Sequence, residues 1–118
     1  DIDLTQMQRK RMNELLFHEV ETYLLTHYSD VNIEDLVNVF HFQKDYFNRL
    51  IRRHTGLTYS GFLQKIRLHK AEEMLLNTKM PVKKIIQAVG YENAHYFYTV
   101  FEKDYGMTPG EYRHSQIH

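Results

Sequence analysis

The sequence has 118 residues and a mass of 14.3 kDa, and 42% of its residues are apolar, 14% aromatic and 25% charged. This composition is that of one globular domain or two small lobes, and it excludes intrinsic disorder. The absence of cysteine excludes a disulfide framework, a thiolate nucleophile and a cysteine zinc site. We find no signal peptide and no apolar run long enough to cross a bilayer, so we expect a soluble protein of the cytoplasm.

The formal net charge is zero, because fifteen basic residues balance fifteen acidic ones. The charges are unevenly distributed along the chain. Residues 1–40 hold three basic and eight acidic side chains, residues 41–70 hold seven and one, and residues 71–118 hold five and six. One strongly basic third therefore suits contact with a polyanion while the remainder stays acidic or neutral.

The whole chain is predicted to be helical, because no stretch alternates apolar and polar residues. A first helix is expected to begin after residues 3–5. Its predicted core stripe, with spacings of three and four residues, is Met12, Leu15, Leu16, Val20, Tyr23, Leu24 and His27. A short second helix begins at Asn32, which is followed by the acids that favour a helix start. That helix is predicted to bury Leu36, Val37 and Phe40.

The apolar pattern breaks near His41 and resumes in a new phase, with Phe47, Leu50 and Ile51 on the core face of a third helix. Gly56 is expected to end that helix. Two short helices joined by a turn, the second one basic, predict a helix-turn-helix motif.

This motif occurs twice. Apolar positions of the first copy recur 49 or 50 residues later as Ile85, Ile86, Val89, Tyr91, Tyr96, Phe97, Val100 and Phe101. Met80 and Pro81 open the second copy, and Gly90 lies in its turn. Thr108, Pro109 and Glu111 then predict a capping box that starts a last short helix.

Between the copies, residues 59–77 are predicted to form one long helix with an apolar surface too wide to face a single core. The predicted fold is therefore all-α, with about seven helices in two helix-turn-helix lobes joined by this shared helix, which would set the orientation of the lobes. We expect residues 1–11 to be an extension, a linker from an upstream domain absent here. Residues 12–58 form the first lobe, and residues 78–118 form the second lobe and tail.

Several residues at fixed spacing closely resemble the signature of the AraC/XylS family of bacterial transcription regulators. They are Arg67, Leu68, Ala71, Gly90, Tyr91, Tyr96, Phe97, Phe101, Lys103, Gly106, Thr108, Pro109, Tyr112 and Arg113. The resemblance covers about residues 12–114. It implies a seven-helix DNA-binding domain whose two motifs enter adjacent major-groove segments, and it implies that such a domain follows an effector-binding or signal-receiving domain. RNA polymerase is a further implied partner if the protein is an activator.

The exposed face of the first recognition helix supplies the candidate DNA contacts. Arg49 can pair with guanine and Asn48 with adenine, so these two residues are the predicted base readers, and the resemblance points to the same positions. Lys44, Arg52 and Arg53 are expected to bind phosphates. Asp45 either accepts a hydrogen bond from cytosine or stabilises the N-terminus of its helix. Gln43 stands where a serine often caps this helix, which predicts a weaker cap.

The second recognition helix offers fewer cations. Its candidate DNA contacts are Asn93, Ala94, His95, Tyr98 and Thr99. At the 50-residue offset the four basic groups of the first helix are reduced to one, Lys103, and Glu102 takes the place of Arg52. We therefore expect the second lobe to hold DNA less tightly and to read it less sharply.

The remaining sequence features do not indicate a further functional site. Arg9, Lys10 and Arg11 are interpreted as a solvated helix face rather than a DNA contact. The sequence lacks a catalytic motif, and its one histidine pair a turn apart, His114 and His118, lies at the chain end, so we expect neither an enzyme nor a metal or other cofactor.

The alternative function is a helical protein-interaction module that kept the fold and lost the groove contacts. The fragment is expected to be monomeric and to bind one non-palindromic duplex site.

Overall fold

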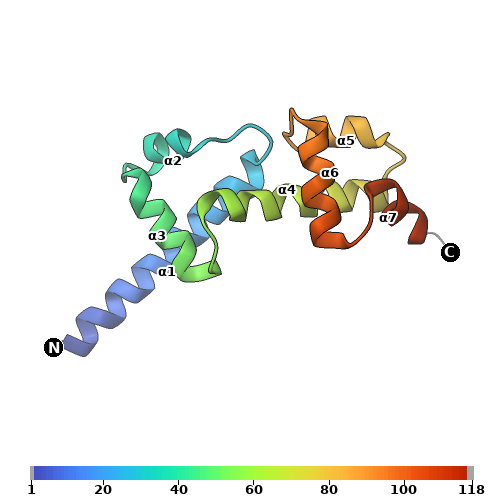
Figure 1. Ribbon diagram of the computed structural model, residues 1–118. Coiled ribbons are helices and arrows are strands. Elements are labelled where there is room, and N and C mark those ends of the chain that lie inside the picture. The colour runs from blue at the N-terminus through green and yellow to red at the C-terminus, as the bar shows by residue number, and fades with distance from the viewer. Residues whose placement is uncertain (1, 117–118) are drawn as a thin grey trace. The chain divides into compact units, whose positions relative to one another are not determined.

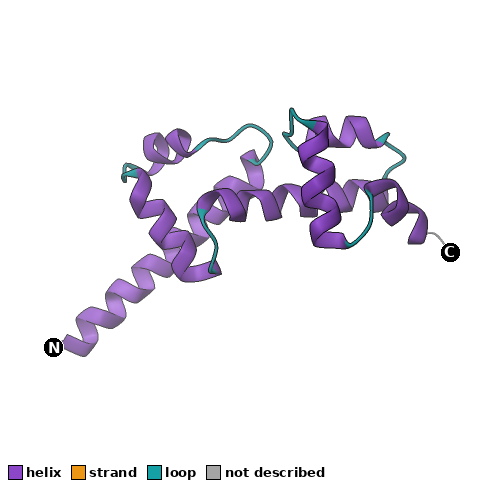
Figure 2. Cartoon of the chain, in the orientation of Figure 1, coloured by secondary structure: helices purple, strands orange, loops and turns teal. Residues whose placement is uncertain are grey.

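The computed structural model describes residues 2–116, and over this span it contains seven α-helices and no strand (Figures 1 and 2). This confirms the predicted all-α class. The helices are α1 (Ile2–His27), α2 (Ile33–Phe40), α3 (Lys44–Thr55), α4 (Tyr59–Asn77), α5 (Val82–Ala88), α6 (Ala94–Tyr105) and α7 (Pro109–Ser115). The outermost residues of the predicted segments, Asp1, Ile117 and His118, lie outside the described span.

The chain divides into two compact units, and the division falls inside α4, between Leu63 and Gln64. The first unit contains α1, α2, α3 and the beginning of α4. The second unit contains the remainder of α4 with α5, α6 and α7. Each unit therefore holds one helix-turn-helix pair, α2 with α3 and α5 with α6.

The first unit is built around the pair α2 and α3, which packs against the second half of α1. Its buried apolar side chains are Val20, Leu24, Val31, Leu36, Phe47, Leu50, Ile51, Tyr59 and Leu63. The three positions predicted for the core of α3 are all among them, at 3% exposure or less. Of the α2 positions, Leu36 is fully buried, whereas Val37 and Phe40 are half-buried.

The prediction for α1 was partly wrong. The helix begins at Ile2, before the predicted start. Val20 and Leu24 are buried as expected, but His27 is exposed, and so are Met12 and Leu15, at 66% and 57%. Apolar residues occupy two sides of this helix, and spacing alone does not say which side meets a core.

Short-range signals place the ends of α2 and α3. Asn32 and Asp35 form a reciprocal capping box at the start of α2, with both bonds at 3.0 Å. His41 ends α2 in the left-handed conformation at φ 64°, which is costly for a residue with a side chain. Gly56 ends α3 at φ 78°, as predicted. Gln43 precedes α3 and makes no capping bond through its side chain, which confirms the weak cap.

The second unit repeats this arrangement. Its buried apolar side chains are Ile66, Leu68, Ala71, Leu75, Ile85, Ile86, Val89, Phe97, Val100 and Phe101. Gly90, in the turn, has φ 102° and occupies the place that His41 has in the first copy. Pro81 lies at the N-cap of α5, and the capping box predicted for Thr108 and Glu111 starts α7.

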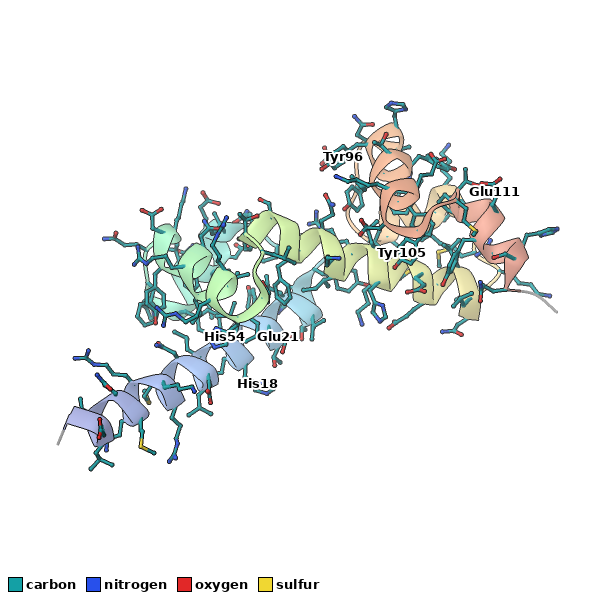
Figure 3. The ribbon with its side chains drawn as sticks, turned by 60° about the horizontal axis from the view of Figure 1, so that its bottom comes forward. His18, Glu21, His54, Tyr96, Tyr105 and Glu111 are labelled. Carbon is teal, nitrogen blue, oxygen red and sulfur yellow. The ribbon has the colours of Figure 1, made fainter. Side chains whose placement is uncertain are left out.

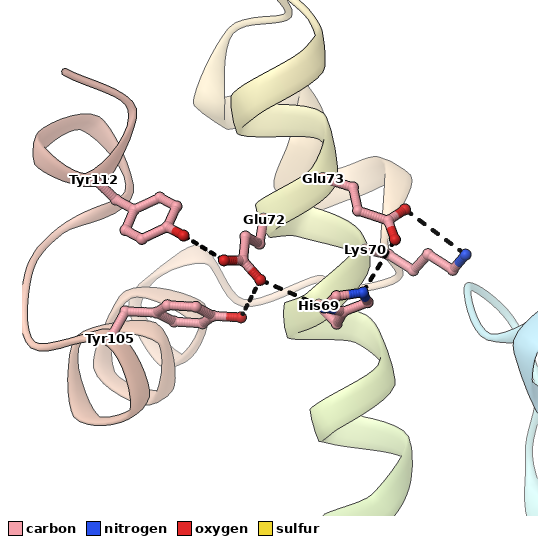
Figure 4. A network of polar contacts seen from close by, with 6 residues as sticks. All are labelled: His69, Lys70, Glu72, Glu73, Tyr105 and Tyr112. Carbon is pink, nitrogen blue, oxygen red and sulfur yellow. Dashed lines mark hydrogen bonds and ion pairs between the residues drawn. The ribbon is translucent and has the colours of Figure 1, made fainter. Parts of the chain in front are cut away.

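Polar contacts from α4 hold α6 and α7 in place (Figure 4). The carboxylate of Glu72 accepts hydrogen bonds from the hydroxyls of Tyr105, at 3.2 Å, and Tyr112. Arg113 of α7 donates to the carbonyl oxygens of Leu75, at 3.0 Å, and Met80, at 2.7 Å, so it holds the end of α4 and the connection to α5. The Tyr105 bond therefore fixes the C-terminal end of α6 to α4, and the other bonds fix α7.

None of the helices over residues 2–116 is long and apolar enough to cross a membrane.

Candidate nucleic-acid interface

The buried face of α3 determines which of its side chains reach solvent. Phe47, Leu50 and Ile51 are spaced three and four residues apart and face the core of the first unit. The opposite face is exposed and carries Asp45, Arg49 and Arg52, and Lys44 and Arg53 are exposed on either side of it. Five of the six first-lobe candidates are therefore exposed on α3, and their contact with DNA stays a prediction.

Asn48, the sixth candidate, is half-buried and already has a partner. Its Oδ1 accepts a hydrogen bond from the backbone N–H of Tyr59 at 2.9 Å. Tyr59 is the first residue of α4, so this bond satisfies one of the N–H groups that a helix start leaves open. The side chain thus joins the recognition helix to α4, a role that its spacing in the sequence did not reveal.

Lys44 also has an intramolecular partner. Its Nζ lies 2.6 Å from Oε1 of Glu34 on α2, with both side chains 57% exposed. The hydrogen bond from Lys44 holds the pKa of the Glu34 carboxyl below its usual value. This ion pair spans the turn of the motif and would compete with a phosphate for the lysine.

Asp45 lies in the first turn of α3, where its negative charge faces the positive end of the helix dipole. Arg52 and Arg53 lie in the last turn, where their positive charges face the negative end. These placements agree with helix stabilisation, and all three side chains are exposed to solvent.

The second recognition helix presents a less basic surface. Ala94, His95 and Thr99 are exposed and Tyr98 is half-buried. The Thr99 hydroxyl donates to the carbonyl of His95 at 3.0 Å, so its oxygen remains as an acceptor. Asn93 caps α6 by accepting from the N–H of Tyr96 at 3.1 Å.

A groove of about 370 Å³ beside α6 brings in residues that the sequence analysis did not select. Ala94 and Tyr98 line it together with Lys83 and Gln87 of α5. Lys83 was missed because the segment 71–118 has almost no net charge. The position of Lys83 on the first helix of the second motif was the sequence feature that could have identified it.

Burial raises the pKa of Tyr91, in the turn of the second motif, to about 12, and the guanidinium of Arg67 opposes this rise. The Arg67 guanidinium carbon lies 5.7 Å from the centre of the Tyr91 ring, a cation–π distance. This pair links α4 to the turn that precedes α6.

The part of the chain that the structure describes contains no group of three or more histidine, aspartate or glutamate side chains placed to hold a metal ion. Of the two histidines one turn apart near the chain end, His114 and His118, the second lies outside that part.

Comparison with known proteins agrees with this geometry. A family model described as a helix-turn-helix domain matches residues 36–115. The HTH-type transcriptional regulator YfiF of Bacillus subtilis (strain 168) is 30% identical over 109 residues, which are 92% of this chain and 34% of YfiF. The chain thus spans about a third of the length of that relative.

Solved structures have the same fold. The C-terminal domain of AraT, a response regulator from Geobacillus stearothermophilus, has a TM-score of 0.78 and 33% identity, with 86% of this chain and 85% of that chain covered. The DNA-binding domain of the global transcriptional factor AdpA, solved in complex with a target DNA, has a TM-score of 0.76 at 22% identity over 83% of this chain and 89% of that chain. At that identity, the likeness to AdpA shows the fold.

Proposed function

The chain belongs to the AraC-type family of bacterial helix-turn-helix transcription regulators, and from this membership we propose that α3 supplies its main sequence-reading contacts. The chain binds double-stranded DNA and serves transcription regulation. The observation that carries the proposal is the exposed basic face of α3, whose opposite side packs into the core through three buried side chains.

Arg49 is the proposed principal reader. It is exposed on the middle turn of α3, and a guanidinium can donate two hydrogen bonds to O6 and N7 of one guanine. Asn48 contributes less to reading, because its Oδ1 holds the N–H of Tyr59 while its amide nitrogen remains as a donor. Lys44, Arg52 and Arg53 bind phosphates, and Lys44 must first leave Glu34.

The second lobe reads DNA more weakly in this proposal. Its groove-facing candidates are Ala94, His95, Tyr98 and Thr99, none of which is a lysine or arginine. Lys83 on α5 adds one cation beside them. We expect one half-site to be sharply defined and the other to be degenerate.

The proposal extends to the longer protein. The chain spans about a third of YfiF, so we propose that it is the output domain of a regulator whose other part receives an effector or a signal. It works in the cytoplasm, on the nucleoid, by binding DNA rather than by catalysis, and RNA polymerase is its partner if it activates. The isolated chain binds as a monomer to a single site, because its two motifs are covalent repeats.

Selection from a pool of random duplexes tests the reading function. Competition titrations on the selected duplex and on a scrambled one then compare two variants. Arg49→Ala should cost about 1–3 kcal/mol on the selected duplex alone, because it removes a base contact. Arg52→Ala should weaken both duplexes and reduce the salt slope by about one. An equal loss on both duplexes for Arg49→Ala would contradict its role as reader.

Sedimentation of the chain with the selected duplex tests the stoichiometry. One chain per site is expected. Two chains on an inverted repeat would contradict the monomer, and would direct attention to the apolar side chains exposed on α1: Leu4, Met7, Met12 and Leu15.

A further inference from the structure

The basic run of α1 lies beside the recognition helix, although more than thirty residues separate the two in sequence. Arg9 and Lys10 line an open groove of about 610 Å³ whose opposite wall carries Arg53 of α3. Three cations from two helices therefore face one space. We interpreted this run as a solvated face from the sequence of its own helix, which does not indicate that Arg53 lies nearby.

A second hollow continues this surface to the proposed base reader. It measures about 270 Å³, and Arg49 and Arg53 both line it. Asn13 and Arg53 border both hollows, so the two adjoin. A line of positive charge thus runs from Arg49 through Arg53 to Arg9 and Lys10.

Specific contacts hold α1 against α3 at this place. The hydroxyl of Tyr46 on α3 donates to Oδ1 of Asn13 on α1 at 3.1 Å. Further along both helices, the ring of His54, which Figure 3 labels, stacks on Phe17 with centroids 4.5 Å apart and planes 3° from parallel. The position of the basic run relative to α3 therefore follows from packing within the first unit.

We propose that Arg9 and Lys10 bind the phosphate backbone that flanks the base pairs read by α3. A recognition helix in the major groove has a phosphate strand on each side, and the strand on the α1 side meets this groove. Long basic side chains reach phosphates without requiring a particular base. The inference rests on the proposed function, because it needs α3 in a major groove.

Glu14 lines the same groove and opposes the binding of an anion there. Its removal should strengthen binding, which gives the proposal a second test of opposite sign.

Arg11 provides a matched control. It is exposed on the same helix and carries the same charge, but it does not line the groove. At about 100° per residue it points roughly 150° away from the mean direction of Arg9 and Lys10. Replacing Arg9, Lys10 or Arg11 by alanine removes one positive charge in each case. A contact in the groove is lost only when Arg9 or Lys10 is replaced.

The experiment measures binding of the 118-residue chain to a duplex that the wild-type chain selects from a random pool, at several salt concentrations. The double variant Arg9→Ala, Lys10→Ala should reduce the slope of log affinity against log salt by about 1.8, or about 0.9 per phosphate contact. Arg11→Ala should leave the slope unchanged, and Glu14→Gln should raise the affinity. Circular dichroism verifies that each variant is folded.

A duplex with methylphosphonates at the flanking phosphates locates the contact. The wild-type chain should lose affinity for it, and the double variant should lose no more. If the double variant and Arg11→Ala behave alike on the unmodified duplex, the inference is overturned while the proposed function stands. If the wild-type chain binds no duplex, the proposed function itself fails.

Discussion

Replacing Asn48 by alanine should destabilise the protein before it changes base reading. The substitution removes the acceptor that lies 2.9 Å from the N–H of Tyr59, and Tyr59 is only 8% exposed. A helix-capping bond of this kind contributes about 0.5–2 kcal/mol, and an N–H left without a partner in a buried site costs about 1–3 kcal/mol. We therefore expect a loss of about 1–2 kcal/mol, which lowers the melting temperature of a chain of this length by about 4–8 °C.

Asn48→Asp is the matched variant. Its carboxylate keeps an oxygen near the same N–H and adds a negative charge at the start of α4, so the stability should be retained. The same carboxylate repels phosphates and cannot donate to adenine, so binding to the selected duplex should fall. Thermal unfolding followed by circular dichroism and DNA titration of both variants separate the two roles. If Asn48→Asp melts as early as Asn48→Ala, or if Asn48→Ala melts with the wild type, the capping argument is refuted.

Three further outcomes follow from single contacts. His41→Gly should raise the free energy of unfolding by about 0.5–1 kcal/mol in urea titrations, because glycine adopts the left-handed backbone at φ 64° without steric strain. The greater conformational entropy of glycine in the unfolded chain offsets part of this gain. An unchanged unfolding midpoint would refute this. Glu34→Gln should increase DNA affinity at fixed salt by releasing Lys44 and removing a negative charge, and the increase should be smaller in a Lys44→Ala background, where only the charge effect remains. The hydrogen bond to Glu72 raises the pKa of Tyr112, so its contribution to stability is complete below about pH 10 and is lost as pH rises through the folded pKa; Tyr112→Phe should flatten the alkaline part of the stability profile, and a profile as steep as that of the wild type would contradict the assignment.

The sequence by itself determined the elements whose causes are local. Asn32, Thr108 and Gly56 start or end helices through bonds and backbone angles within a few residues, so their residue types suffice to predict them. The repeat likewise predicted the buried positions of the second motif, including Phe97 and Phe101, because two copies of one motif bury the same positions.

Tertiary structure alone decided the roles that depend on a neighbour distant in sequence. Spacing predicted one apolar stripe on α1, but packing within the first unit buries only part of it, including Val20 and Leu24, and leaves Met12 and Leu15 exposed. In the same way, Asn48 has the residue type of a base reader, but the start of α4 lies within hydrogen-bond distance of it. Arg9 and Lys10 carry charge in any conformation, and they line one groove with Arg53 only because α1 packs against α3. A periodic pattern indicates which residues share one face of a helix. It does not indicate which other helix packs against that face, because helices distant in sequence come into contact only when the chain folds.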